Sequence, residues 1–258
     1  MLMPVFSAEY AQAFVLVLLR VSTIIVMMPI LGHKTVPVRV KAGLSLIISF
    51  LIFPFVRQTI PAISPNLIPM IFQMAGEVMI GLILGFAVKI VFTGIQYAGE
   101  LIGLQMGFSM ANVLDPVNNI NVSIISEMQY LMALLIFLSI NGHHIFITAI
   151  TDSYRILQPL GFHISGPLTQ AILLYAKEIF VIAVKAAAPI IAVMLFANLG
   201  MALIARTVPQ INILIVGFPL QIAVGLIFLG LTMPIFLKVI ETYFVSLEGQ
   251  MNTLMKLM

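Results

Sequence analysis

Long apolar runs, separated by short segments rich in proline, glycine and asparagine, form the dominant pattern of the chain. The run 10–31 holds a single charged residue, and it is long enough to cross a bilayer, which takes about 20 helical residues. The run 42–56 is shorter and uncharged. Three prolines in 58–69 predict an irregular loop after it. These two runs are therefore predicted to be the first two helices.

Two later runs are longer than one membrane crossing requires. The run 68–104 has 37 residues. As a helix it would be about 55 Å long, whereas the hydrocarbon core of a bilayer is about 30 Å thick. The run 168–203 repeats this feature, and Pro189 near its middle predicts a kink. Helices of this length are expected to tilt steeply, to break, or to stand partly outside the lipid.

The remaining pattern predicts shorter elements. Helices are expected over 123–140 and 145–157, with the loop 158–167 after them. The run 211–237 is uncharged but contains two prolines, and the tail 238–258 looks amphipathic. Together these runs predict an all-α membrane protein.

One segment is unusual because it combines turn residues with apolar side chains. Residues 106–123 contain four asparagines and the pair Asp115-Pro116, which predict a loop. The same segment carries Met106 and Phe108 among several other apolar residues. Irregular backbone at membrane depth must be buried in protein or line a cavity. We therefore expect this apolar loop to lie inside an assembly.

Composition supports the membrane assignment. Charged residues make up 8% of the chain, hydrophobic residues make up 62%, and the mean hydropathy is +1.18. A soluble fold needs more polar residues to cover its surface, so a soluble enzyme and a disordered protein are excluded. The net charge is only +3 and no basic stripe is present, which argues against nucleic-acid binding.

A small set of charges lies inside the apolar runs. Each costs roughly 2.5–3.5 kcal/mol at the bilayer centre, so each is expected to be paired or near water. One interpretation is a proton or ion relay; the favoured one is pairing with neighbouring helices or subunits. Two pairs, Lys89 with Glu100 and Glu178 with Lys185, each share a helix face without touching. The intramembrane charges are Arg20, Glu77, Lys89, Glu100, Lys177, Glu178 and Lys185.

Glycines recur at a spacing of four in the first long run. Gly81 and Gly85 form one pair, and Gly99 and Gly103 begin a second series. Small residues at this spacing let another backbone approach closely. Two interpretations stay open: a face shaped for partner subunits, or packing against the chain's own helices.

Residue types that carry catalysis are sparse and poorly placed. His143 and His144 are adjacent, and on a helix they would diverge by about 100°, so they do not suit one metal ion. The pair is expected to serve a turn or a helix cap over 141–144. No HExxH, GxSxG or phosphate-binding glycine loop is present, and the spacing of Ser139 to His143 is ordinary. The sequence predicts no enzyme activity, no metal and no cofactor.

Several segments together resemble a known family. The stretch Gly99–Pro116, the Asn-Gly-His-His of 141–144 and the segment from Ala205 through Pro219 resemble, in the same order, the flagellar biosynthetic protein FliR family of the type III secretion export apparatus. Pro37-Val38-Arg39-Val40-Lys41 also fits, so the resemblance spans essentially the whole chain.

The resemblance implies a place in an export gate. Family members assemble with FliP and FliQ and contact FlhB in the bacterial inner membrane, within the flagellar basal body. Their long kinked helical hairpins stack into a collar around a channel for unfolded flagellar proteins, in contact with membrane lipids. The chain would form one export-gate domain over 1–258, with a FliP-like half at 1–165 and a FliQ-like hairpin and tail at 166–258.

The resemblance also assigns a role to the apolar loop. In the family the loop after the long helix plugs the closed channel, and here that loop is 107–122. The implied plug residues are Gly107, Phe108, Met110, Asn112, Val113, Leu114, Asp115, Pro116, Asn118 and Asn119.

An alternative from another class is a secondary transporter, with broken helices around a midplane site for a small solute. A transporter should be stable alone, whereas a gate subunit should depend on its partners. Lys34, Arg39 and Lys41 favour a cytoplasmic loop over 32–41, a rule that a collar above the membrane would weaken.

Overall fold

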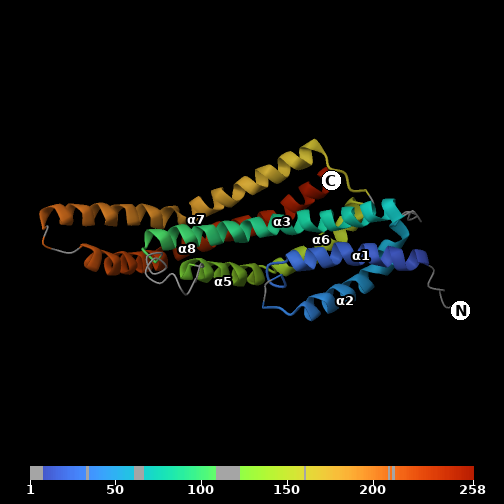
Figure 1. Cartoon of the computed structure of the whole chain (residues 1–258), viewed down its shortest axis with the longest axis horizontal. Helices are drawn as coiled ribbons and strands as arrows, with labels where there is room; N and C mark the ends of the chain where they lie inside the picture. The colour runs from blue at the N-terminus through green and yellow to red at the C-terminus, as the bar shows by residue number, and fades with distance from the viewer. Residues whose placement is uncertain are drawn as a thin grey trace. The chain divides into compact units, whose positions relative to one another are not determined.

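The computed structural model describes residues 8–32, 35–60, 67–108, 123–159, 161–208, 210 and 213–258. Helices make up all the regular structure of these residues (Figure 1). They are α1 (Ala8–Met27), α2 (Val38–Val56), the short 3-10 helix η1 (Arg57–Thr59), α3 (Leu67–Gln105), α5 (Ile124–Ser139), α6 (Gly142–Ile156), α7 (Gly166–Thr207) and α8 (Ile213–Leu257).

The prediction of an all-α membrane protein is confirmed. Among the described residues, α1, α2, α3, α7 and α8 are long and apolar enough to cross a membrane. The helices α5 and α6 are joined at a bend of 66° and together reach the same length and apolarity. The described part of the chain therefore offers five such spans, or six if the bent pair is counted.

The chain forms two compact units. Unit 1 contains Met1–Ile90, Asn141–Ala176 and Ser246–Met258. Unit 2 contains Val91–Ile140 and Lys177–Val245. Each unit therefore combines segments from before and after residue 165, and the FliP-like and FliQ-like halves stay a prediction.

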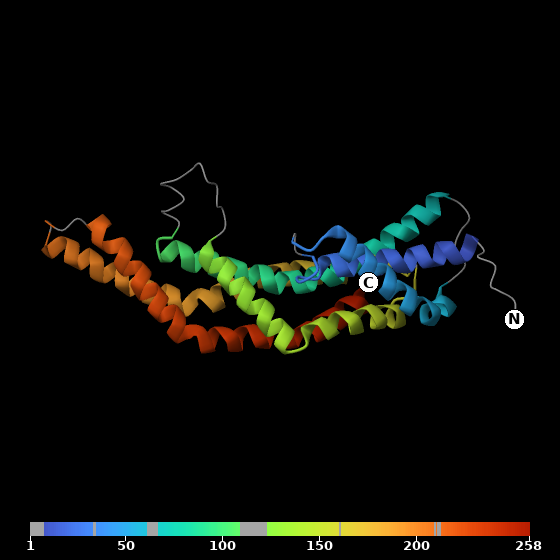
Figure 2. The same cartoon turned by 90° about the horizontal axis from the view of Figure 1, so that it is seen from below.

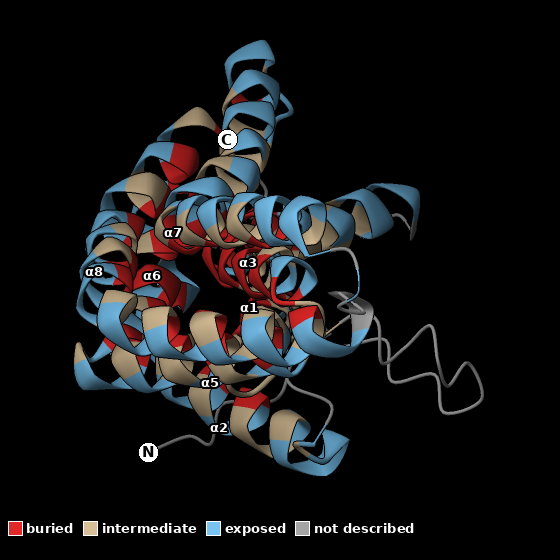
Figure 3. Cartoon of the chain, turned by 90° about the vertical axis from the view of Figure 1, so that its left-hand side faces the viewer, coloured by how far each residue is buried: buried red, intermediate tan, exposed pale blue. Residues whose placement is uncertain are grey.

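The core of unit 1 is built on α1 and the first part of α3. Val17, Val21 and Ile24 of α1 are fully buried and recur at a spacing of three to four residues, which places them on one helix face. On α3, Ile80 and Leu84 are also fully buried and lie four residues apart, on one helix face. The α3 ribbon accordingly carries many buried positions, red in Figure 3.

The core of unit 2 is aromatic. Phe92 of α3, Phe137 of α5 and Phe244 of α8 meet with ring centroids 5.2–5.6 Å apart. Tyr130 of α5 adds an edge contact to Phe92 at 5.6 Å. Aromatic pairs in such geometries add about 0.5–1.5 kcal/mol each beyond the area they bury. This cluster fixes three helices against one another within the unit.

Two helices differ from the sequence-based expectation in extent. The first long run forms one unbroken helix, α3, of 39 residues. The run and the tail predicted after residue 211 are one helix, α8, of 45 residues. Pro219 and Pro234 lie inside α8, and its orange-to-red ribbon bends rather than running straight (Figure 2). A proline bends a helix without ending it where the freed carbonyl is satisfied otherwise.

The two adjacent histidines, expected in a turn or a helix cap, lie at the start of a helix. Asn141 adopts the left-handed conformation with φ of 59°, and α6 begins directly after it. Asparagine tolerates this conformation better than most residues. The backbone N–H of His144 donates to the Asn141 carbonyl at 2.8 Å, so His143 and His144 belong to the first turn of α6.

Candidate functional site

A buried ion pair lies at the centre of unit 1. Arg20 of α1 is fully buried, and its Nε donates to Oε2 of Glu77 of α3 at 2.5 Å. Glu77 is also buried. An arginine in this setting needs several acceptors, because an unpaired charge in an apolar interior is very costly.

Those acceptors come from the end of α6. Nη1 of Arg20 donates to the backbone carbonyls of Ser153, at 3.0 Å, and Leu157, at 3.2 Å. Both carbonyls lie at the C-terminal end of α6, where the helix dipole is negative, and the Ser153 carbonyl also accepts the Leu157 N–H at 2.9 Å. The Tyr154 ring lies 4.2 Å from the guanidinium carbon, and its hydroxyl donates to the Val17 carbonyl of α1. One arginine therefore ties α1, α3 and α6 together.

The other charges of the apolar runs are not drawn into this cluster. Lys89, Glu100, Lys177 and Lys185 are exposed, and Glu178 is half-buried. Nζ of Lys185 donates to the Tyr243 hydroxyl of α8 at 3.3 Å. Within the described ranges, the remaining four residues make no ion pair. The structure thus brings together Arg20 and Glu77, and it leaves the other five charges exposed or half-buried in this chain.

The four predicted glycines all lie at close contacts with helices of the same chain. A Cβ on Gly81 would lie 2.7 Å from Cβ of Thr23 in α1, and one on Gly85 would overlap Met27. In unit 2, a Cβ on Gly99 would overlap the Ser126 backbone of α5. Gly103 is similarly close to the hydroxyl of Ser123, the residue that precedes α5. Of the two open interpretations, the structure displays packing within the chain.

The end of α3, where the predicted apolar loop begins, has a defined backbone motif. Gly107 has φ of +83°, which a residue with a side chain rarely adopts. The N–H of Phe108 donates to the Gly103 carbonyl at 3.0 Å, and the N–H of Gly107 donates to the Leu104 carbonyl at 3.1 Å. This pair of bonds is a Schellman motif, in which a left-handed glycine ends the helix.

The end of α3 is anchored to α8 by its neighbouring side chain. Met106 is fully buried, and a Cβ on Gly225 of α8 would lie 2.5 Å from its Cγ. Gly107 approaches Phe218 of the same helix. We call Met106, Gly107, Phe218 and Gly225 the loop root.

Two of the ten predicted plug residues lie in the described part of the chain. Gly107 and Phe108 are described and half-buried. The other predicted plug residues lie outside the described residues: Met110, Asn112, Val113, Leu114, Asp115, Pro116, Asn118 and Asn119.

Sequence reasoning missed the partners of the buried arginine and of the loop root. Ser153 and Tyr154 are polar residues within a helix that otherwise presents apolar side chains to the core, and that position was a usable signal. Nothing in the sequence around Gly225 indicates its partner, because a lone glycine in an apolar run does not show which side chain will pack against it.

The fold and these contacts define the class: an all-α membrane protein with long apolar helices, a buried ion pair between α1 and α3, and an end of α3 that packs closely on α8. Residues 11–247 match the family described as "Bacterial export proteins, family 1". The chain belongs to this family, which includes the flagellar biosynthetic protein FliR.

Curated relatives match along nearly their whole length. The chain is 35% identical to the flagellar biosynthetic protein FliR of Escherichia coli (strain K12) over 232 residues, which is 88% of this chain and 86% of the relative. It is 33% identical to that of Bacillus subtilis (strain 168), covering 94% of each chain. For Aquifex aeolicus (strain VF5) the identity is 28%, over 92% of each.

Proposed function

We propose that this chain is an integral subunit of the flagellar type III protein export gate in the bacterial inner membrane. Membership of the FliR family makes it a component of the flagellar export apparatus. Within that apparatus it forms, with FliP and FliQ and in contact with FlhB, the channel for unfolded flagellar proteins. The observation that carries the proposal is the family match over residues 11–247. The role is structural, and no catalytic residue is assigned.

Helix length supports a place in a larger assembly. The helices α7 and α8 have 42 and 45 residues, or about 63 and 68 Å at 1.5 Å per residue. Fitting about 63 Å of straight helix into a core about 30 Å thick needs a tilt near 60°, beyond the usual range of about 0–40°. Parts of both helices then stand outside the lipid, where their apolar side chains need partner subunits to cover them.

Exposure supports the same conclusion. In the most apolar windows, 33% of α7 and 17% of α8 is buried, against 67% of α3. Within unit 2, Gln221 of α8 donates to Asn198 of α7 at 2.7 Å, and Tyr243 of α8 meets Lys185 of α7. Residues further along α8 thus meet earlier residues of α7, which makes an antiparallel hairpin. We assign this hairpin to the FliQ-like half at 166–258.

The loop 107–122 is proposed as the plug of the closed channel. Burying each apolar side chain contributes roughly 1.5–3 kcal/mol, so a few anchors hold a plug shut reversibly. The loop root supports the proposal because it fixes one end of the segment to α8. Gate opening then requires the segment to move about a fixed point rather than to leave the assembly.

Affinity purification from a native membrane tests the proposed place. The tagged full-length chain should co-purify with FliP, FliQ and FlhB, and it should restore secretion of a flagellar substrate to cells that lack their own copy. A monodisperse chain that purifies alone, without these subunits, and that binds a small solute would overturn the proposal in favour of the transporter.

A further inference from the structure

We propose that a groove between α1 and α2 binds one acyl chain of a glycerophospholipid, and that Arg57 holds the phosphate of the same molecule. The site lies wholly in unit 1 and is separate from the charge cluster and the loop root. It does not depend on the proposed place in the export gate.

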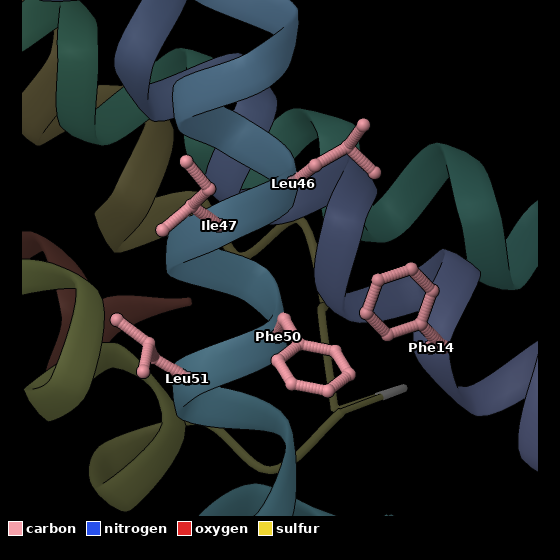
Figure 4. A pocket seen from close by; sticks show the side chains of 5 residues that line it. All are labelled: Phe14, Leu46, Ile47, Phe50 and Leu51. Atoms are coloured by element: carbon pink, nitrogen blue, oxygen red, sulfur yellow. The ribbon is translucent and has the colours of Figure 1, made fainter.

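The groove is open and apolar, with a volume of about 330 Å³. Phe14 of α1 lines one side, and in Figure 4 it lies beside Phe50 of α2. Leu46, Ile47 and Leu51 complete the lining. Phe50 is 73% exposed in a helix that is apolar enough to span a bilayer, so in the membrane this surface meets hydrocarbon or another protein.

A cation lies beyond one end of the groove. The guanidinium carbon of Arg57, directly after α2, lies 3.5 Å from the ring centre of Tyr10 in α1. Phe14, one turn after Tyr10, packs edge-on against Phe53 at 5.6 Å, which connects this end to the groove. Stacking on an aromatic ring holds the guanidinium in place and leaves its N–H donors free for an oxyanion.

Arg57 has no acidic partner in the described part of the chain. The ion pairs found there are Arg20 with Glu77 and Arg155 with Asp152. Glu9 is adjacent to Tyr10 but forms no ion pair with Arg57. A planar cation without a carboxylate suits a phosphodiester, which guanidinium binds through paired N–H donors.

The distance along the helix from Arg57 to the far end of the groove matches the hydrocarbon thickness of one leaflet. Leu46 and Arg57 are separated by 11 residues, or about 16 Å along a helix. Half of the hydrocarbon core is about 15 Å. An acyl chain lying along this surface from the phosphate at Arg57 would therefore reach the groove within its own leaflet.

A protein helix fits this groove less well. The α2 side chains that line it extend from Leu46 to Leu51, about 7.5 Å along the axis. A helix with its side chains is about 10–12 Å wide, so it would lie across the groove and leave Arg57 unpaired. A single hydrocarbon chain satisfies both the apolar lining and the cation.

Lipid retention by the full-length protein, purified with its co-purifying subunits, tests the site. The probes are phosphatidylglycerol, diacylglycerol with the same acyl chains, and inorganic phosphate, each measured by native mass spectrometry. Arg57→Ala should lower phosphatidylglycerol retention about tenfold, because it removes the charged N–H donors that bind the phosphate. Diacylglycerol retention should not change, and inorganic phosphate alone should not be retained.

Arg39→Ala is the matched control, because it removes the same charge from the opposite end of α2. It should leave phosphatidylglycerol retention unchanged. An equal loss from both variants would show general attraction of the lipid to positive charge and would overturn the site. A photo-crosslinking residue at position 50 should label lipid; labelling of a protein instead would also overturn it.

Discussion

Arg20 and Glu77 are separated by 57 positions in the chain, yet Nε of the arginine lies 2.5 Å from Oε2 of the glutamate, and both side chains are buried. The pair joins α1 to α3, and the same guanidinium satisfies carbonyls at the end of α6. A buried pair of this kind contributes little net stability compared with apolar residues, but losing one partner leaves an uncompensated charge. The ion pair therefore acts mainly by determining which helices pack together.

Removing the acid should destabilise unit 1. Glu77→Ala leaves Arg20 charged and buried among apolar side chains, at a cost of about 3–5 kcal/mol. The variant should accumulate poorly in the membrane, and any purified complex should unfold at a lower temperature. Membrane abundance by immunoblot and thermal unfolding of the purified protein measure this.

Two further variants distinguish the loss of the ion pair from the general effect of removing a charged side chain. Glu100→Ala removes an acid from the exposed face of the same helix, and it should leave abundance unchanged. The double variant Arg20→Met with Glu77→Leu replaces the pair by apolar residues and should recover much of the loss. If Glu77→Ala accumulates as well as Glu100→Ala, the pair does not hold these helices.

The sequence predicted the helices well and their partners poorly. Hydrophobic runs locate the helices because a membrane requires long apolar segments with internally satisfied backbone. The desolvation cost of Arg20 and Glu77 in apolar runs predicted that each would be paired or near water. Their pairing with one another depends on which faces of α1 and α3 meet, and no local pattern encodes that.

Helix ends and continuity were predicted less reliably for a different reason. The sequence favoured an apolar run over 211–237 followed by a separate tail, because the run contains Pro219 and Pro234 and a charge follows it. The structure has instead one helix, α8, that continues through all of these positions. Tertiary packing, such as that of Phe244 against Phe92, overrides local breaking signals. The plug residues from Met110 to Asn119 stay a prediction, because they lie outside the described residues.

Close glycine contacts between α1 and α3 should be sensitive to a single methyl group. Gly85→Ala places its Cβ against Met27 Cβ, so the helices must separate, and overpacking costs typically about 1–3 kcal/mol. Gly43→Ala in α2 meets no atom within 4 Å and should be neutral or stabilising. Thermal unfolding of the two variants measures the difference; equal unfolding temperatures would contradict the close contact.

The left-handed glycine at the loop root gives a prediction about backbone conformation. Gly107→Val should destabilise the end of α3 by more than about 1–2 kcal/mol, because a branched side chain at φ of +83° is strained. Gly107→Asn should be tolerated better, since asparagine enters this region more readily. Thermal unfolding and export rate measure both variants, and a Val variant equal to the Asn variant would contradict the motif.

Lys185 is expected to serve packing rather than ion transfer. Its Nζ meets the Tyr243 hydroxyl on an exposed surface of unit 2. Lys185→Arg should preserve assembly and export. Lys185→Met should lower assembly yield and export in parallel, because the loss lies in a contact between helices. Co-purification yield and substrate secretion give the two measurements, and normal assembly with abolished export would support the ion-relay interpretation instead.

Deleting residues 108–119 should make the assembled gate leak small ions while leaving assembly intact, because the loop root and the packed helices lie outside the deletion. The milder variant Phe108→Gly with Met110→Gly should leak less, since two apolar anchors account for only about 3–6 kcal/mol of burial. Met79→Gly, on the exposed face of α3, is the matched control, and a gate with this substitution should remain impermeable to ions. Membrane conductance in cells expressing the whole gate measures the leak. An assembled gate that remains ion-tight after the deletion would place the seal in another subunit.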